Sequence, residues 1–487
     1  MLPAANRHKA RSTRSGDVVS SLPSARPARR RSLPVVDEPK SSLATDGRRR
    51  FIYPADVTGR FATARKAVFL LLIAIYAALP WITIGGHPAL FLNVERREFY
   101  LFGGVFNAQD MWMTVFLFTG AAFGLVVVTA TLGRVWCGWA CPQTVFLDGV
   151  FRRIERIVEG PHDKRRRRDD GPWSLDKLWR KIVMHALFLG TSFLLAHVLL
   201  AYFVSVRSVL SFVVHRPSEH VEVFIGVSAL TLVLYFNFAW FREQFCVVLC
   251  PYGRLQSALF DSDSLIVGYD VGRGEPRGKT KKENAGDCVD CLRCVAVCPT
   301  GIDIRNGLQM DCIACTACID ACDEIMDRLG RERGLIRYDS QNGLAGEPRK
   351  FWRPRMFVYA ALGTLGILAA SFAFSQRNAF DANLLRSVGA PYEVDGPVVR
   401  DAFHLHIVNK HSRVTTFTVE PRVAPNAEFL VPIRTVTLPP LGSADVPVFV
   451  TVQRASFRAE FPVRIAVVPN VGSAVEVTAA FLGPEKP

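Results

Sequence analysis

Five stretches of the sequence are almost free of charge and are each about as long as a bilayer core is thick. They cover roughly 67–84, 111–132, 182–204, 221–241 and 356–374. About 20 helical residues cross the hydrocarbon core of a membrane. A buried soluble helix is the alternative, but the near-absence of charge over these lengths argues against it. The pattern therefore predicts a multi-domain membrane protein with an α-helical transmembrane bundle of five spans, the first kinked or ended by Pro80.

The charged residues orient these spans. The chain has a net charge of +15 although 49% of its residues are apolar, and short loops rich in Lys and Arg stay on the cytoplasmic side of a membrane. Residues 134–181 contain twelve Lys or Arg, whereas loops 85–110 and 205–220 contain two each. The N-terminus, 134–181 and 242–355 are thus expected to face the cytoplasm, and the chain from about 376 onward the other side. The basic residues lie beside apolar spans rather than along one folded face, so nucleic-acid binding is not expected.

Residues 1–66 are rich in Arg, Ser, Pro and Ala, and they contain no apolar run that could form the core of a signal peptide. We expect a disordered basic tail here. A mitochondrial transit peptide has a similar Arg-rich and acid-poor composition, but a flexible cytoplasmic tail explains the same residues.

Eight of the twelve cysteines form two runs of equal spacing within 35 residues. Both runs follow C-x2-C-x2-C-x3-C. In bacterial ferredoxins the first three thiolates of such a run hold one [4Fe–4S] cluster, and the fourth ligates the other cluster. A zinc site would need only four ligands, usually in two separated pairs. Two [4Fe–4S] clusters are therefore expected, one held by Cys288, Cys291, Cys294 and Cys322, and the other by Cys312, Cys315, Cys318 and Cys298.

One position departs from the ferredoxin pattern. Pro299 follows the first run, whereas Asp323 follows the second. Proline fixes φ and lacks an N–H, so its loss is expected to loosen this corner or to change hydrogen bonding near the cluster without removing a ligand. Basic residues before the runs could steer an acidic electron donor, although a solvated linker is the plainer explanation; they include Lys279, Lys281 and Lys282.

The other four cysteines form two C-x3-C-P motifs. Cys137 and Cys141 follow the second span directly, and Cys246 and Cys250 follow the fourth. Residues four apart share a face of a helix, so each motif presents two thiols together if its span continues that far. The predicted orientation puts both motifs at the cytoplasmic edge of the membrane, where we expect a metal site. Soft thiolates favour Cu(I), zinc or iron–sulfur centres, and the alternative is four small buried residues at helix ends.

Four further polar residues lie in or beside the spans. His185 and His197 both occur in the third span, but twelve residues at about 100° each place them roughly 120° apart around a helix. A haem shared between them is therefore not expected, although a histidine within a membrane merits a functional test. Arg134 and Glu243 precede the two C-x3-C-P motifs, and we expect them to be interface anchors rather than catalysts.

The pattern changes after the fifth span to short alternating apolar runs. These runs cover 403–408, 414–419, 446–452, 463–468 and 475–481, and turn residues separate them. Period-two runs of this kind predict a β-sandwich. The Cys and Trp hallmarks of antibody domains are absent, so only an immunoglobulin-like (Ig-like) architecture is supported, and the domain offers no catalytic constellation.

These features divide the chain into five parts. The expected boundaries are 1–66 for the basic tail, 67–258 for the four-span region with both C-x3-C-P motifs, 259–350 for the cytoplasmic ferredoxin-like domain, 351–376 for the fifth span and 377–487 for the β-sandwich. Every cysteine then falls on the cytoplasmic side or at its membrane edge.

With the spans, motifs and β domain in this order, the chain resembles the FixG/RdxA/CcoG family of cytochrome oxidase accessory proteins over nearly everything after residue 60. The C-x3-C-P pairs also occur in NapH-type membrane ferredoxins, and the β domain after a fifth span favours the first family. The resemblance implies a bacterial inner-membrane protein with a periplasmic C-terminal domain. It further implies an oxidoreductase that reduces Cu(II) to Cu(I) on the cytoplasmic side and so helps to assemble the cbb-type haem–copper oxidase. Composition and spacing do not show copper.

The implied partners are a cytoplasmic electron donor and copper-handling proteins or oxidase subunits. Two other functions fit the same sequence. One is a NapH-like conduit from quinol to a partner protein, and the other is a copper metallochaperone without redox activity, in which the clusters only stabilise the fold. The sequence assigns no catalytic residue, and it leaves open the donor, the reduction potentials, the role of the β-sandwich and the oligomeric state, with a homodimer as one option.

Overall fold

The computed structural model describes most of the chain. The described residues are 51–84, 87–94, 98–106, 110, 112–278, 285–375, 380–410, 413–422, 426–440 and 442–484. Residues 1–50 of the predicted tail lie outside these ranges, and so do Lys279, Lys281 and Lys282.

The five predicted spans are confirmed as helices long and apolar enough to cross a membrane. They are α1 (Arg60–Ala78), α2 (Met113–Leu132), α7 (Leu175–Leu200), α9 (Val221–Phe236) with its π-helical continuation η4 (Asn237–Phe241), and α15 (Pro354–Ser375). Pro80 ends the first span as predicted, because it lies in the short 3₁₀ helix η1 (Leu79–Trp81) that follows α1. Helix α7 begins seven residues before the predicted 182, since the Ser174 side chain accepts the Lys177 N–H at 3.2 Å and caps the first turn.

The expectation of disorder up to residue 66 is wrong for its last part. Helix α1 begins at Arg60, and the Ala55 N–H donates to Ala296 O at 2.8 Å, which joins the preceding segment to the ferredoxin-like domain. The first turn of α1 is capped by Asp320, whose carboxylate accepts the N–H groups of Phe61 at 3.3 Å and Ala62 at 2.6 Å. Sequence composition could not reveal this cap, because its acceptor lies 258 residues away.

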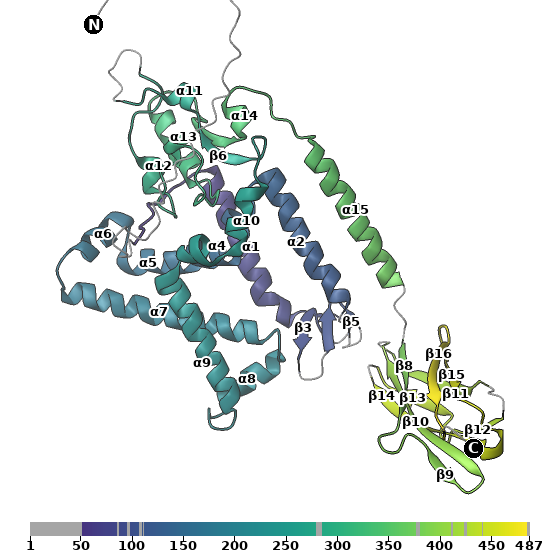
Figure 1. Cartoon of the computed structure of the whole chain (residues 1–487). Helices are drawn as coiled ribbons and strands as arrows, with labels where there is room; N and C mark the ends of the chain where they lie inside the picture. Colours follow the sequence, from purple (N-terminus) through teal and green to yellow (C-terminus); the bar gives the residue numbers. More distant parts are fainter. Residues whose placement is uncertain are drawn as a thin grey trace, which may run out of the picture.

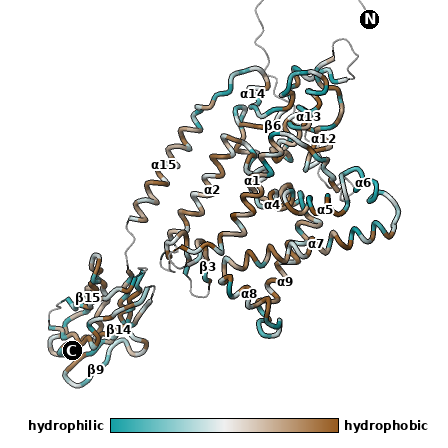
Figure 2. Tube along the Cα trace, turned by 180° about the vertical axis from the view of Figure 1, so that it is seen from behind, coloured by the Kyte–Doolittle hydropathy of each residue, from teal (hydrophilic) through white to brown (hydrophobic). Residues whose placement is uncertain are grey.

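The helices fall into two groups (Figures 1 and 2). Helices α1, α2 and α15 extend from the ferredoxin-like domain toward the opposite end of the molecule, and α15 packs on α2 through the rings of Phe123 and Tyr359. Helices α7 and α9 cross one another and enclose a core of Phe151, Phe188 and Phe238. Figure 2 shows that these helices are mostly hydrophobic along their length, as a lipid environment requires.

Short elements connect the spans. Between α2 and α7 lie α3 (Val135–Trp139), α4 (Pro142–Phe146), the π-helix η3 (Leu147–Phe151), α5 (Arg152–Glu159) and α6 (His162–Asp170). Helix α8 (Val206–Val214) joins α7 to α9, and η5 (Phe245–Leu249) and α10 (Pro251–Leu259) follow α9. Between α1 and α2, β1 (Thr83–Ile84) pairs with β2 (His87–Pro88), and β3 (Leu90–Asn93), β4 (Glu98–Leu101) and β5 (Gly104–Phe106) form an antiparallel sheet.

The ferredoxin-like domain lies at one end of the bundle (Figure 1). Its strands β6 (Ile266–Tyr269) and β7 (Ile336–Asp339) pair antiparallel and enclose the cysteine runs between them in sequence. Its helices are α11 (Val271–Gly274), α12 (Arg293–Ala296), η6 (Ile304–Asn306), α13 (Ala317–Arg328) and α14 (Gln341–Leu344).

The C-terminal β-sandwich is confirmed. One sheet has the order β12-β14-β10-β8 with β9 added to β10, and the other has the order β13-β11-β15-β16. Five strands coincide with the predicted runs, and only the first residue of the run 414–419 lies outside its strand. They are β10 (Val398–Asn409), β11 (Thr415–Pro421), β14 (Ser443–Gln453), β15 (Phe461–Pro469) and β16 (Val475–Phe481). The strands that the alternation did not predict are β8 (Phe380–Arg386), β9 (Glu393–Asp395), β12 (Ala427–Leu430) and β13 (Thr435–Leu438).

A buried ion pair joins the β-sandwich to the segment before α2. Lys410 lies 2.9 Å from Asp110 and 2.8 Å from Asp381, and its side chain is only 6% exposed. The β-sandwich is thus held to the bundle by a charge contact as well as by the chain that follows α15.

Candidate iron–sulfur and thiol sites

The two cysteine runs fold into loops of the same shape. Within these two loops, four residues other than glycine have positive φ, and they occupy matching places: Asp290 (55°) and Leu292 (56°) in the first run, and Ala314 (52°) and Thr316 (66°) in the second. L-residues adopt this left-handed conformation only at an energetic penalty, and such strain gathers at functional sites. In each loop, the second of these residues immediately precedes a helix, α12 or α13. The shared turns curl each loop so that its first three thiols face one region.

The structure groups the eight cysteines into two cavities. One cavity is lined by Cys288, Cys291, Cys294 and Cys322. The second is lined by Cys298, Cys312, Cys315 and Cys318, and Cys294 also touches it. This grouping is the crossed one expected from the spacing, with the fourth cysteine of each run beside the other run. The remaining walls of both cavities are mainly apolar, and they include Ile302, Ile304, Leu335 and Ile336.

The chemistry of these two donor sets suits [4Fe–4S] clusters. Among the described residues, no three His, Cys, Asp or Glu side chains lie close enough together to hold a single metal ion. A four-iron cluster takes one thiolate on each iron, so its four ligands stay further apart than those of one ion. Burial raises the pKa of the Cys312 thiol to about 11 and the pKa of Cys294 to about 12. These two thiols are therefore protonated without metal, and cluster binding must displace their protons.

Of the two effects expected from Asp323, a looser corner or changed hydrogen bonding, the structure shows the second. It lies inside α13, which continues past Cys322 to Arg328, whereas α12 ends at Ala296, before Pro299. The buried Asp323 carboxylate accepts the Gly334 N–H at 3.0 Å. A proline at this place would interrupt α13, so the departure from the ferredoxin pattern accompanies a longer helix.

The C-x3-C-P motifs do not continue their spans, so the assumption of a shared helix face is wrong. Each span is interrupted four residues before its first cysteine, by Gly133 with φ 64° and by Arg242 with φ 50°. The first cysteine of each motif then lies in a new short helix, Cys137 in α3 and Cys246 in η5. The second cysteine of each motif has an extended backbone and is the N-cap residue of the next helix, Cys141 of α4 and Cys250 of α10. The proline that follows lies in the first turn of that helix, where its missing N–H is tolerated.

The four thiols of these motifs nevertheless lie in one neighbourhood. The pKa of the Cys246 thiol is raised, mainly by burial and to a smaller extent by the nearby thiols of Cys141, Cys137 and Cys250. Burial also raises the pKa of Cys137 to about 11, and the Gln256 side-chain amide donates to its Sγ at 3.3 Å. In the described part of the chain these thiols do not converge at single-ion distance. Their metal-binding role stays a prediction.

The first C-x3-C-P motif packs directly on the second cysteine run. Cys137 and Cys318 both pack against a buried cluster that contains Cys315. Gly138 lies so close to the opposite loop that an added Cβ would be 2.5 Å from Ile313 O and 2.8 Å from Ala314 O. A side chain larger than hydrogen would therefore separate the motif from the cluster-binding loop.

Arg134 and Glu243 are not lipid-interface anchors, because both are buried in polar contacts between elements. Arg134 donates to the carbonyls of Met310 and Gly253, and more distantly to Cys312 O at 3.3 Å. Glu243 lies 3.4 Å from Arg152. The two residues hold the C-x3-C-P motifs against neighbouring parts of the protein.

The two histidines of α7 form no common site. The His185 ring contacts the Tyr235 hydroxyl at 3.0 Å, and His197 contacts Phe193 O in its own helix at 2.8 Å. At 1.5 Å per residue they lie about 18 Å apart along the axis.

The fold and these sites together define a membrane protein with a ferredoxin-type iron–sulfur domain and an Ig-like β-sandwich. Three family models match the chain in agreement with this description. A 4Fe–4S dicluster domain matches residues 241–341, a 4Fe–4S binding domain matches 113–161, and the Ig-like fold at the C-terminus of FixG matches 370–484.

Similar proteins extend the match over most of the chain. The nitrogen fixation protein FixG of Rhizobium meliloti is 35% identical over 420 residues, which cover 77% of this chain and 80% of FixG. RdxA of Cereibacter sphaeroides is 38% identical, and the match covers 64% of this chain and 69% of RdxA. RdxB of the same organism is 33% identical, and the match covers 76% of this chain and 82% of RdxB. The chain therefore belongs to the FixG/RdxA family and is an iron–sulfur membrane protein of the electron-transfer type. A crystal structure of a FixG-related protein from Vibrio parahaemolyticus aligns with 22% of this chain and 97% of its own, at 14% identity and a TM-score of 0.20.

Proposed function

We propose that this protein reduces Cu(II) to Cu(I) at the membrane-edge thiols, with single electrons supplied from the ferredoxin-like domain, and thereby supports assembly of a cbb-type haem–copper oxidase. The observation that carries the proposal is the direct packing of Cys137 and Gly138 on the Ile313–Cys318 loop. Bound [4Fe–4S] clusters would supply one-electron transfer at the two four-cysteine cavities. In the described chain, Cys137 packs against the same buried cluster as Cys318, and that cluster contains Cys315 of the second cavity.

The residues around the thiols suit copper as the substrate. Thiolates are soft ligands that favour Cu(I), so a thiol-rich site stabilises the product of the reduction over Cu(II). Each copper ion accepts one electron, and no proton is part of that step. Binding of copper to Cys137 must displace the thiol proton, because burial raises its pKa to about 11.

We further propose that the protein lies in the bacterial inner membrane, with the N-terminus and the cysteine sites in the cytoplasm and the β-sandwich in the periplasm. The twelve Lys or Arg of residues 134–181 support this orientation. So does the position of the two domains at opposite ends of α15 (Figure 1). A cytoplasmic electron donor would then reach the ferredoxin-like domain, and copper-handling proteins or oxidase subunits would receive Cu(I).

The test uses the purified full-length protein with its clusters reduced, and it follows Cu(I) formation with a Cu(I)-specific chelating dye. We expect the double substitution Cys137→Ser and Cys141→Ser to retain about eight irons, the total for two four-iron clusters, while Cu(II) reduction falls at least tenfold. Gly138→Ala should slow the reaction with iron content unchanged, and Gly190→Ala is the matched control because a Cβ there meets no atom within 4 Å.

Unchanged copper reduction in the double variant would refute the role of these thiols. A protein that binds copper at them but never oxidises its clusters would be a metallochaperone instead. Cluster reduction by a quinol, without any effect of copper, would favour the quinol conduit.

A further inference from the structure

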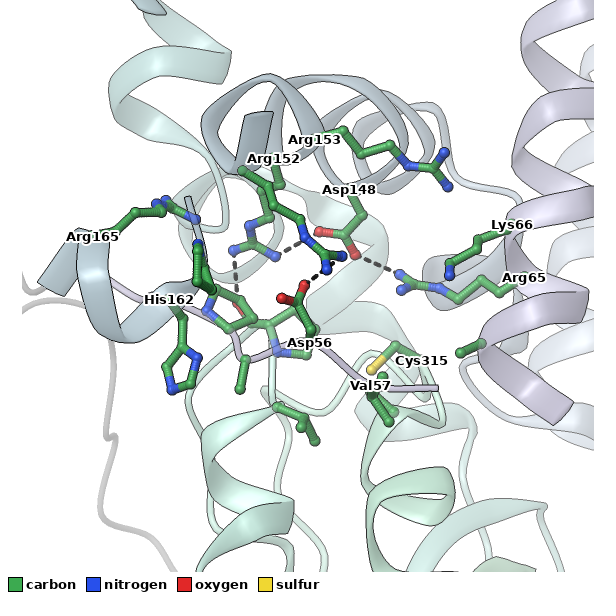
Figure 3. Close-up of a pocket in the computed structure, with 18 of the residues that line it drawn as sticks. Asp56, Val57, Arg65, Lys66, Asp148, Arg152, Arg153, His162, Arg165 and Cys315 are labelled. Carbon is green, nitrogen blue, oxygen red and sulfur yellow. Dashed lines mark hydrogen bonds and ion pairs between the residues drawn. The ribbon is translucent and has the colours of Figure 1, made fainter. Parts of the chain in front are cut away.

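A basic cavity lies beside the second cysteine run, and neither the copper reaction nor the cluster ligands account for it. Its volume is about 180 Å³, more than ten times the roughly 15 Å³ that one water molecule needs. It is lined by the first turns of α1, by the helices from η3 to α6, by the segment 54–57 and by the cluster-binding loops (Figure 3). Cys315 forms part of its wall.

The wall of this cavity carries more positive than negative charge. Its cationic side chains are Arg65, Lys66, Arg152, Arg153, Arg156 and Arg165, and its acidic side chains are only Asp56 and Asp148. Both acids are already paired. Asp148 lies 2.6 Å from Arg65 and 2.6 Å from Arg152, and Asp56 lies 2.8 Å from Arg156.

Two cationic side chains in this wall lack a partner. Within the described ranges, neither Lys66 nor Arg153 makes an ion pair or side-chain hydrogen bond, and Figure 3 shows both at the cavity. The Arg152 side chain is 10% exposed and is held by the protein: it lies 2.6 Å from Asp148 and 3.4 Å from Glu243, and it donates to Pro299 O at 3.0 Å. An oxygen-rich anion in the cavity would supply Lys66 and Arg153 with the partner that the protein does not give them.

A role in orienting the protein in the membrane does not by itself explain why these basic side chains gather around a cavity. Basic residues that only set orientation can remain solvated, as Arg166 does with a side chain 71% exposed. Arg65 and Arg152, in contrast, are 14% and 10% exposed. The carboxylate of Asp148 holds both in position, and they also donate to backbone carbonyls, Arg65 to Gly138 O at 2.8 Å and Arg152 to Pro299 O at 3.0 Å.

We propose that this cavity binds a phosphate-bearing anion at the membrane edge, next to the second cluster-binding loop. Guanidinium groups match phosphate oxygens with paired hydrogen bonds, and basic pockets on the cytoplasmic side of membrane helices suit phosphate head groups. The same chemistry is offered by an anionic phospholipid and by a soluble phosphate compound, so the experiment separates these two sources. The proposal does not depend on copper reduction.

The test uses the full-length protein with its clusters in nanodiscs of zwitterionic lipid, and inorganic pyrophosphate as the soluble probe. We expect calorimetry to detect binding, with Lys66→Gln combined with Arg153→Gln weakening it at least tenfold. The matched control is Lys164→Gln combined with Arg166→Gln, which removes the same charges from α6 outside the cavity and should bind like the unaltered protein. Equal iron content in all three proteins shows that each is folded.

A second arm measures retained phospholipid after purification from membranes. Retention of anionic lipid that only the cavity variant loses would identify a head group as the occupant, and pyrophosphate binding without such retention would identify a soluble phosphate compound. The proposal is overturned if the cavity variant and the control behave alike in both arms. An independent readout is the reduction potential of the clusters, which a bound anion beside Cys315 should lower because it disfavours the added electron.

Discussion

Replacement of Asp320 by Ala should open the first turn of α1 while the rest of the protein stays folded. The Asp320 carboxylate is 4% exposed and accepts both the Phe61 and the Ala62 N–H groups. Gly59 precedes the helix and has no side chain, so the Asp320 carboxylate can approach closely; a Cβ at this position would collide with Asp320. Alanine leaves two partly buried N–H groups of α1 without an acceptor.

The expected loss can be worked out from these contacts. Hydrogen bonds to a charged group contribute about 1.5–3 kcal/mol, and loss of an N-cap costs about 0.5–2 kcal/mol. We therefore expect a local destabilisation of about 2–3 kcal/mol. Each 1.4 kcal/mol is a factor of ten in an equilibrium constant, so amide hydrogen exchange at Phe61 and Ala62 should become roughly 30- to 150-fold faster.

The assay is hydrogen–deuterium exchange of the cluster-containing protein, read by mass spectrometry on peptides that cover the start of α1. Asp320→Asn should have a smaller effect, because the amide oxygen still accepts a hydrogen bond but lacks the charge that favours a helix N-terminus. Asp327→Ala is the control, since Asp327 is on the same helix but pairs with Arg333 at 2.6 Å in an exposed position. Equal exchange in the Asp320→Ala and Asp327→Ala proteins would refute the capping role.

Three further predictions concern other parts of the chain. Asp323→Pro restores the ferredoxin pattern but should lower the iron content measured by metal analysis, because proline interrupts α13 at a penalty of about 3 kcal/mol. Lys410→Met should lower the unfolding midpoint of the β-sandwich in calorimetry by roughly 10 °C, since it leaves Asp110 without its lysine and breaking a buried pair costs about 3 kcal/mol or more. Gly133→Ala should reduce the thermal stability of the four-span region, because φ there is 64° and a Cβ would collide with a carbonyl; Gly124→Ala, where a Cβ meets nothing within 4 Å, should not.

Much of the fold could be predicted because the signals are local. Apolar length determined the five spans, and alternation found β10, β11, β14, β15 and β16. The short or edge strands escaped detection. Strand β9 has three exposed residues and β12 has no fully buried one, so neither carries a strong period-two pattern.

The candidate sites were predictable only in part. Ligand spacing is a local property, and it gave the grouping that the two cavities display. The contacts of Gly138 and Asp320 are long-range, and no neighbouring residue signals them. The left-handed turns at Leu292 and Thr316 also escaped prediction, because neither residue type favours positive φ and the conformation is imposed by the loop as a whole.

The Asp320 cap also bears on the order in which the protein is made. Asp320 lies 259 residues after Phe61 in the sequence, and its carboxylate accepts a hydrogen bond from the Phe61 N–H. At about 5–20 residues per second, a ribosome needs roughly 13 to 50 s to reach Asp320 after it has passed α1. If the first span enters the membrane during synthesis, it does so with its N-terminal turn uncapped, and synthesis and folding of the cysteine-rich domain complete that end of the bundle. A nascent chain that failed to fold this domain would keep an open first helix, which gives quality-control proteases a structural difference to detect.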